Sequence, residues 1–150
     1  RLTNTYGPRQ LIRHNRQGFI GWFVRKAALG EEIQIFGDGA QKRDFNHVDD
    51  VVDAFLRAGA SPASDGQVFN LGGDAPLSLL DLVKLLMEVS GGGSYRLVPF
   101  PEERKRIDIG DFHADTRKVR SALGWEPRTP LPRGLAETVA YYRAHREHYL

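Results

Sequence analysis

Apolar side chains recur at helical spacing in several separate stretches of the chain. Between residues 18 and 29, an apolar stripe predicts an amphipathic helix that stops at Gly30, because glycine readily adopts the left-handed conformation of a helix end. The same spacing predicts four further helices, over residues 50–60, 78–90 and 115–123 and from about residue 132 onward.

Shorter apolar or alternating runs separate these helices and predict strands. The first ten residues look like a strand end followed by a turn, and three more strands are expected at residues 32–36, 67–71 and 95–100. Residues 101–111 are charged and are expected to form an irregular connection. The pattern indicates one α/β unit over residues 1–150, with mixed helices and strands and no internal repeat.

Polar residues in front of the helical runs are candidates for helix caps. Asp49 or Asp50 is expected to cap the second helix, and Asp115 the fourth. Ser78, with Asp81 three residues later, resembles a capping box.

Composition narrows the class of protein. The 41% hydrophobic and 27% charged fractions are ordinary for a globular chain, and no run approaches the roughly 20 apolar residues of a membrane helix. The net charge of +2 is too small to demand a nucleic-acid partner. The absence of cysteine fits a reducing compartment, so a cytoplasmic location is expected.

Several familiar catalytic motifs do not occur in these 150 residues. A G-x-G-x-x-G dinucleotide loop, a Walker loop, a G-x-S-x-G elbow and an H-E-x-x-H zinc motif are all missing. His145 and His148 lie one helical turn apart but have no third ligand nearby in the sequence, so no metal site is expected.

Arginine is the residue type that suggests a ligand. Several arginines fall in the first loop, after the glycine turn at residues 37–39, and in the 101–111 connection. A guanidinium can hold a phosphate through two parallel hydrogen bonds, so these arginines could form a diphosphate cradle. Composition alone favours the alternative, in which these arginines are solvated or paired with nearby acidic residues.

Three segments then resemble one known family in the family's own order. They are RLTNTYGPRQ, IQIFGDGAQKRDFNHVDDVVDAF and DFHADTRKVRSALGWEPRTPLPRGL. Together they resemble the extended short-chain dehydrogenase/reductase group of NAD-dependent nucleotide-sugar epimerases and dehydratases. UDP-glucose 4-epimerase, dTDP-glucose 4,6-dehydratase and UDP-glucuronate decarboxylase are familiar members.

The resemblance implies which part of such an enzyme this chain is. In the family, an N-terminal Rossmann half carries the NAD loop and a catalytic Tyr-x-x-x-Lys pair, and no such pair occurs in this sequence. We therefore expect residues 1–150 to be the C-terminal substrate-binding half, with the last strands of the Rossmann-type fold. This chain alone is expected to hold no catalytic residue and to be inactive.

The resemblance also implies binding residues. Asn4 corresponds to a residue near the diphosphate, and Thr5 and Tyr6 begin a loop near the nicotinamide of NAD. Phe19 and Ile20 align with the nucleotide pocket, although core packing is an equal alternative for them.

A second group of residues is expected to hold the nucleotide. Gln34 and Phe36 belong to the strand that holds the base, and Arg43 matches the arginine that binds the diphosphate. Arg106 is the preferred second diphosphate ligand, with Arg104 and Lys105 as alternatives. The acidic residues Asp44 and Asp49 are expected to orient Arg43 and to cap a helix, and His47 to pack.

The expected function is nucleotide-diphosphate-sugar binding within a UDP-glucose 4-epimerase-like enzyme. The substrate would be a UDP- or dTDP-sugar, the cofactor NAD, and the chain could form a homo-oligomer, with no nucleic-acid or membrane partner. The alternatives are the same part of a 4,6-dehydratase or decarboxylase, or a non-catalytic nucleotide-sugar-binding protein.

Overall fold

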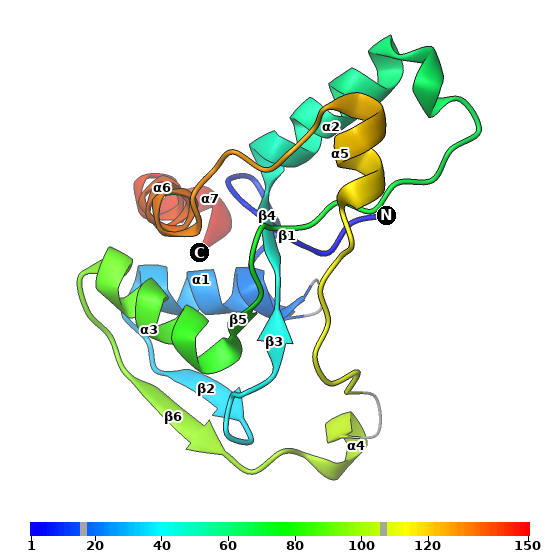
Figure 1. The fold of residues 1–150 in the computed structure, drawn as a ribbon. Helices are drawn as coiled ribbons and strands as arrows, with labels where there is room; N and C mark the ends of the chain where they lie inside the picture. The colour runs from blue at the N-terminus through cyan, green and yellow to red at the C-terminus, as the bar shows by residue number, and fades with distance from the viewer. Residues whose placement is uncertain (16–17, 106–107) are drawn as a thin grey trace.

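A computed structural model describes residues 1–15, 18–105 and 108–150 of the chain (Figure 1). Its helices are α1 (Phe19–Leu29), α2 (Val48–Ala60), the 3-10 turn η2 (Pro62–Ser64), α3 (Leu79–Ser90), α4 (Glu102–Lys105), α5 (Arg117–Leu123), α6 (Leu131–Ala144) and α7 (Arg146–Tyr149). Its strands are β1 (Asn4–Tyr6), β2 (Ile33–Phe36), β3 (Lys42–Arg43), β4 (Phe45–His47), β5 (Leu77–Ser78) and β6 (Tyr95–Val98). The predicted α/β class is confirmed.

The strands associate in pairs that are distant in sequence. β1 lies parallel to β4, with Asn4 opposite Phe45 and Tyr6 opposite His47. β2 lies parallel to β6, and β3 is antiparallel to β5. Parallel strands need long crossover connections, and helices supply them here: α1 lies between β1 and β4, and α3 between β2 and β6.

The main hydrophobic core lies where α1, α3 and α6 pack against one another (Figure 1). Each helix turns its apolar stripe inward, as the periodicity of the sequence requires. The buried aliphatic residues on the three helices are Ile20, Val24, Leu82, Val83, Leu86, Leu135 and Val139. The core thus fixes α1 beside β2, which positions the cleft described below.

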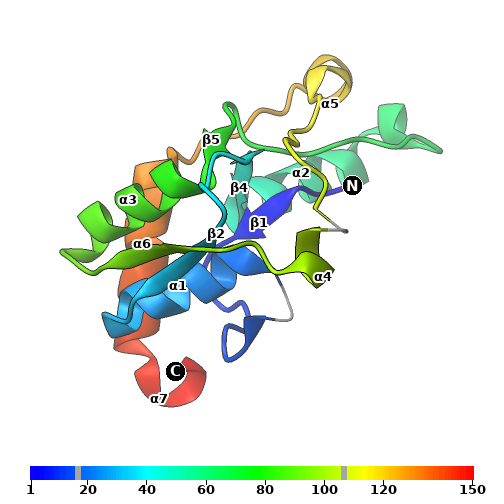
Figure 2. The ribbon, with the colours of Figure 1, turned by 90° about the horizontal axis from the view of Figure 1, so that it is seen from below.

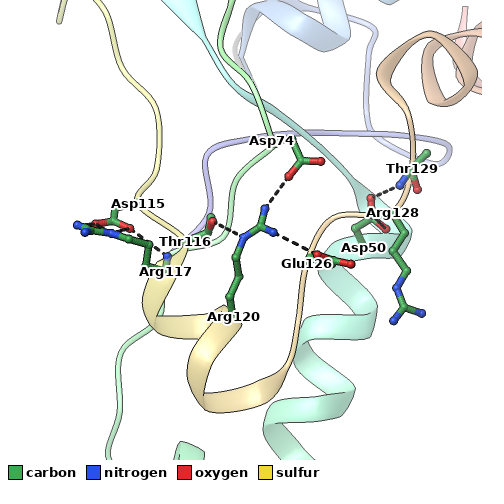
Figure 3. A network of polar contacts seen from close by, with 9 residues as sticks. All are labelled: Asp50, Asp74, Asp115, Thr116, Arg117, Arg120, Glu126, Arg128 and Thr129. Atoms are coloured by element: carbon green, nitrogen blue, oxygen red, sulfur yellow. Dashed lines mark hydrogen bonds and ion pairs between the residues drawn. The ribbon is translucent and has the colours of Figure 1, made fainter.

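A smaller core joins α2 and α5. Trp125 is fully buried there, and its indole nitrogen donates to the backbone oxygen of Asp50 at 2.8 Å. The carboxylate of Asp50 accepts hydrogen bonds from the backbone N–H groups of Arg128 (3.1 Å) and Thr129 (3.0 Å) (Figure 3). Asp50 therefore holds the segment before α6 against the start of α2.

An ion-pair network surrounds α5 (Figure 3). The guanidinium of Arg120 contacts Asp74 at 2.6 Å and Glu126 at 3.2 Å. On the solvent side, the hydrogen bond from Arg117 lowers the pKa of the Asp115 carboxyl to about 2. The network ties α5 to the segments before and after it.

Two of the predicted elements are wrong in detail. Residues 67–71 do not form a strand, because only Leu71 makes a bridge, to Leu2, and one bridge is too short a ladder. The 101–111 connection is not wholly irregular, since α4 occupies Glu102–Lys105.

The predicted helix caps are only partly right. The Ser78 hydroxyl accepts from the Asp81 backbone N–H, as predicted. The cap of α2 is His47, whose Nδ1 accepts from the Asp49 backbone N–H at 3.3 Å, while Asp49 and Asp50 lie in the first turn. Thr116 directly precedes α5 and makes no side-chain cap bond, while the Asp115 carboxylate, one residue earlier, accepts from the Arg117 backbone N–H at 3.0 Å. For α2 and α5, the residue at the cap position lies one or two residues away from the nearest predicted one.

No helix in the described part of the chain is long and apolar enough to cross a membrane.

Candidate functional site

A cleft of about 440 Å³ opens beside α1 and β2. Figure 2 shows β2 and β6 running alongside α1, with α4 beyond the end of β6. The side chains that line the cleft come from α1, β2, β3, the start of α3 and the loops around them: Asn15, Phe19, Trp22, Phe23, Gln34, Ile35, Phe36, Gln41, Arg43, Leu79, Phe100 and Asp108.

Aromatic side chains make up one part of the cleft wall. Phe36, at the end of β2, lies 5.7 Å from Phe100 between ring centroids, and Phe19 meets Phe23 edge to face at 5.6 Å. Phe36 and Phe100 come together because β2 and β6 are parallel neighbours that end at the same edge. Such flat apolar surfaces suit a planar ring.

The polar part of the cleft is built around Arg43. Its side chain is nearly buried, and Nη1 donates to the backbone oxygens of Lys42 (2.8 Å) and Gly110. Nη2 faces the Asp108 carboxylate at 3.4 Å. The guanidinium is thereby held in one orientation with part of its edge in the cleft, an arrangement suited to binding an anion.

The loop that carries Asp108 is fastened to β3 by its backbone. Asp111 accepts a hydrogen bond from the Lys42 N–H at 2.8 Å, and the Phe112 N–H donates to the Lys42 oxygen at 3.0 Å. The loop therefore crosses directly over Arg43 and places Asp108 beside it.

A second, more open cavity of about 640 Å³ lies beside β1. Its wall is formed by Thr5, Tyr6 and the 7–10 loop, together with the start of α2 and Tyr141. Burial raises the pKa of the Tyr6 hydroxyl above its ordinary value, so this tyrosine stays protonated.

The 7–10 loop is held from α6. The buried Tyr142 hydroxyl donates toward the oxygens of Gly7 (3.2 Å) and Gln10 (2.9 Å), on either side of Arg9. Arg9 has a φ of 67°, a left-handed conformation that costs a residue with a side chain about 1 kcal/mol or more. The tyrosine thus stabilises a strained turn at the cavity wall.

Comparison with known proteins relates this geometry to a family. Residues 1–72 match the model of the NAD dependent epimerase/dehydratase family. Over 143 residues the chain is 38% identical to UDP-glucose 4-epimerase of Mycolicibacterium smegmatis, covering 93% of this chain and 43% of that protein. The chain is related to the NAD-dependent epimerases and dehydratases.

Solved structures related to this family have the same fold. The UDP-glucose 4-epimerase of Thermotoga maritima, solved with UDP-glucose, is 36% identical with a TM-score of 0.81, over 97% of this chain and 45% of that one. A dTDP-glucose 4,6-dehydratase from Streptomyces venezuelae, solved with NAD and TYD bound, is 28% identical with a TM-score of 0.82, over 99% and 44%. The chain spans less than half the length of these relatives.

Four of the residues that the family resemblance singled out meet in the 440 Å³ cleft. They are Phe19, Gln34, Phe36 and Arg43. Ile20 is buried in the main core and does not line the cleft, because neighbouring positions on a helix differ by about 100° in direction.

The other predicted residues lie elsewhere. Asn4 donates from Nδ2 to the backbone oxygen of Asp44 at 3.0 Å, outside the cleft lining. Thr5 and Tyr6 share the second cavity. Arg106 lies outside the described residues.

The expected partner of Arg43 was wrong. Asp44 does not pair with it, and instead accepts from the Ala114 backbone N–H at 3.1 Å. Asp108, in a distant loop, is the acid beside Arg43. His47 is buried against Tyr6, with ring centroids 5.3 Å apart, so it packs as expected in addition to capping α2.

Sequence reasoning missed several residues of the cleft. Phe23 belongs to the apolar stripe that predicted α1, Trp22 precedes it outside that stripe, and Phe100 follows β6 with no motif around it. Gln41 lies in the recognised G-D-G-x-Q-x-R-D-F segment, which was a usable signal. Its Oε1 is buried with no hydrogen-bond partner among the described residues, so it is available as an acceptor.

Among residues 1–15, 18–105 and 108–150, no three histidine or acidic side chains lie together in a way that could hold a metal ion.

Proposed function

We propose that this chain is the nucleotide-sugar-binding part of an NAD-dependent sugar epimerase. The observation that carries the proposal is the position of Arg43, the single cation among the described residues that line the cleft, whose other side chains are aromatic, aliphatic or amide apart from Asp108. A nucleoside diphosphate offers both chemistries, a planar base and a compact anion.

The cleft suggests a division of roles. Phe36 and Phe100 would contact the base, with Gln34 at its rim and Phe19 on the opposite wall. The fixed guanidinium of Arg43 would bind the diphosphate. The family resemblance also assigns Asn4, which lies outside this lining, and Arg106, which lies outside the described residues, to the diphosphate.

A contribution to NAD binding is proposed for the second cavity only. Thr5, Tyr6 and the 7–10 loop form a wall with room for a planar ring, but the sequence has no glycine-rich loop to receive the cofactor phosphates. This chain would therefore supply one side of the cofactor site. NAD, when bound, supplies reversible hydride exchange at the sugar C4, for which the fold here would hold the sugar in register.

Exposed apolar residues support the assignment to part of a larger enzyme. On α2, Phe55 is 65% and Leu56 68% exposed, and Leu2 beside them is 48% exposed. Leu2 and Phe55 line one open cavity together, and exposed apolar side chains that gather in this way mark a surface that packs against protein. We assign it to contact with the rest of the enzyme, consistent with relatives more than twice as long.

The proposal is tested by calorimetric titration of this chain with UDP, dTDP, CDP and GDP. We expect saturable binding of a pyrimidine diphosphate, weakened about 10- to 100-fold in Arg43→Gln through loss of a charge-assisted contact. Arg96→Gln is the matched control, because Arg96 lies on neighbouring β6 and pairs with Glu32 outside the cleft lining.

Two results would overturn the assignment. One is absence of nucleotide binding by a chain whose circular dichroism shows the expected helices. The other is equal weakening in Arg43→Gln and Arg96→Gln, which would mean a general charge effect.

A dehydratase is the second candidate, because the likeness to a solved dTDP-glucose 4,6-dehydratase is as strong structurally as the likeness to the epimerase. Preference for dTDP over UDP in the same titration would favour it. Binding together with failure of the complete protein to turn over either UDP- or dTDP-glucose would favour a non-catalytic binding protein.

A further inference from the structure

Trp22 is a large aromatic side chain on the α1 wall of the cleft. Phe19, Trp22 and Phe23 all line the cleft, because residues three and four positions apart lie on one face of a helix. Phe23 is buried, whereas Trp22 is only partly buried. The tryptophan ring therefore presents more of its surface to a ligand than the neighbouring phenylalanine does.

Two cations lie beside the Trp22 ring. The guanidinium carbon of Arg25 is 6.0 Å from the ring centroid, and Nζ of Lys26 is 5.2 Å from it. Both cations reach the ring from the same helix, because they follow Trp22 by three and four positions. A cation at this distance is attracted to the electron-rich face of an indole.

Each of the two cations is itself held by the protein. Both terminal nitrogens of Arg25 donate to the backbone oxygen of Leu150, at 3.2 and 3.3 Å. The ammonium group of Lys26 is paired with the Glu31 carboxylate at 2.5 Å. Because these cations are fixed, they favour one orientation of the Trp22 ring. A ligand that contacts the ring then loses less free energy in ordering it.

The polar atom of Trp22 is available to a ligand. Its indole N–H makes no hydrogen bond to any residue that the structure describes. In the other tryptophan, Trp125, the indole N–H is bonded to the Asp50 oxygen at 2.8 Å. An indole offers a flat apolar face and one hydrogen-bond donor, which match the ring and the carbonyl oxygens of a pyrimidine base.

We propose that Trp22 contacts the base of the bound nucleotide, in an orientation that Arg25 and Lys26 fix. The proposal rests on the proposed function of the cleft. Trp22 contributes the α1 side of the base site, opposite the aromatic side chains at the ends of β2 and β6. Arg25 is a positioning residue, because it acts on the ligand only through the Trp22 ring.

The first test measures the tryptophan fluorescence of this chain with UDP and with 5-bromo-UDP, while calorimetry confirms that each ligand is bound. Bromine on the base quenches an excited indole only at close contact. We expect 5-bromo-UDP to quench the wild-type chain more strongly than UDP does. This extra quenching should be absent in Trp22→Phe, which retains Trp125, a fully buried tryptophan outside the cleft lining.

The second test measures the affinity for UDP. Trp22→Leu keeps an apolar side chain but removes the ring and its N–H, so UDP binding should weaken about 2- to 10-fold, the range for a lost aromatic contact. Phe69→Leu is the matched control. Phe69 also has a cation beside its ring, Nζ of Lys118 at 5.3 Å, but lies outside the cleft lining. This control variant should bind UDP as tightly as wild type.

The third test concerns the positioning role of Arg25. Arg25→Gln should weaken UDP binding about 2- to 5-fold, and it should lower the fluorescence anisotropy of Trp22 without ligand, because the ring loses a fixed cation. A loss of stability alone would not change that anisotropy in the folded chain. Arg57→Gln is the control, because Arg57 also donates to a carbonyl at a helix end, that of Gly124 at 2.9 Å, away from the cleft lining. It should change neither quantity.

The inference is overturned if bound 5-bromo-UDP quenches the fluorescence no more than UDP does, or if Trp22→Leu binds UDP as tightly as Phe69→Leu does. Unchanged affinity and anisotropy in Arg25→Gln would overturn the positioning role of Arg25. In each of these cases, binding of UDP by the wild-type chain still supports the proposed function. If the wild-type chain does not bind UDP, the proposed function fails and the inference fails with it.

Discussion

Replacing Gly134 by alanine should destabilise the fold, although alanine is the better helix former. Gly134 lies in the first part of α6, where a Cβ atom would come within 2.3 Å of the Tyr6 hydroxyl and 3.1 Å of the His47 ring. Both neighbours are buried, with Tyr6 2% and His47 3% exposed. The glycine is required by this close approach.

The expected magnitude follows from two opposing effects. Glycine to alanine inside a helix stabilises by up to about 1 kcal/mol. Forcing a methyl group against a packed tyrosine costs about 3 kcal/mol, at the upper end of the overpacking range, because a distance of 2.3 Å requires the ring or the helix to move. The net loss is about 2 kcal/mol, which lowers the melting temperature of a chain this size by roughly 4–8 °C.

Gly59→Ala is the matched control for this prediction. Gly59 lies in α2, and a Cβ atom there would meet no atom within 4 Å. Only the propensity effect remains, so this variant should be more stable than wild type by about 0.5 kcal/mol. Thermal and urea unfolding followed by circular dichroism measures both variants. A Gly134→Ala protein as stable as Gly59→Ala would refute the steric argument.

Two further predictions concern buried polar groups. Asp50→Ala should lower the free energy of unfolding measured in urea by about 2–4 kcal/mol, because it leaves the N–H groups of residues 128–129 without their acceptor. Asp49→Ala, at an exposed position, should lower it by less than about 1 kcal/mol. Equal losses in the two variants would contradict the role assigned to Asp50. Burial raises the pKa of Tyr142 to about 12, so its contribution to stability is complete below its ordinary value near pH 10 and is lost as the pH rises toward 12. Tyr142→Phe should therefore reduce the loss of stability between pH 10 and 12. At pH 7 it should lower the free energy of unfolding by about 1–2 kcal/mol, because its hydrogen bonds to the 7–10 loop are lost. An unchanged dependence of stability on alkaline pH would assign the loss to other tyrosines.

Local sequence patterns determined most of the elements. The stripes that predicted α1, α3 and α6 are real because each helix must bury one apolar face. Gly30 and Gly91 end their helices in the left-handed conformation, and Ser78 caps α3, since these effects depend on residues within one helical turn.

The family motif also singled out Arg43 and Phe36, and both line the cleft. A short motif is sufficient for this, because both residues lie within one segment that resembles the family. It could not tell Phe19 from Ile20. Both are apolar neighbours on one helix, and only the packing of α1 turned one side chain to the cleft and the other to the core.

Contacts between distant segments were decided by the tertiary structure alone. The pairing of Arg43 with Asp108 depends on a loop 65 residues further along the chain, and the choice of His47 as the α2 cap depends on its packing beside Tyr6. A sequence lists which charges and rings exist and how they are spaced locally. Which of them meet is settled by the joint burial of several helices and strands, a property that no single segment contains.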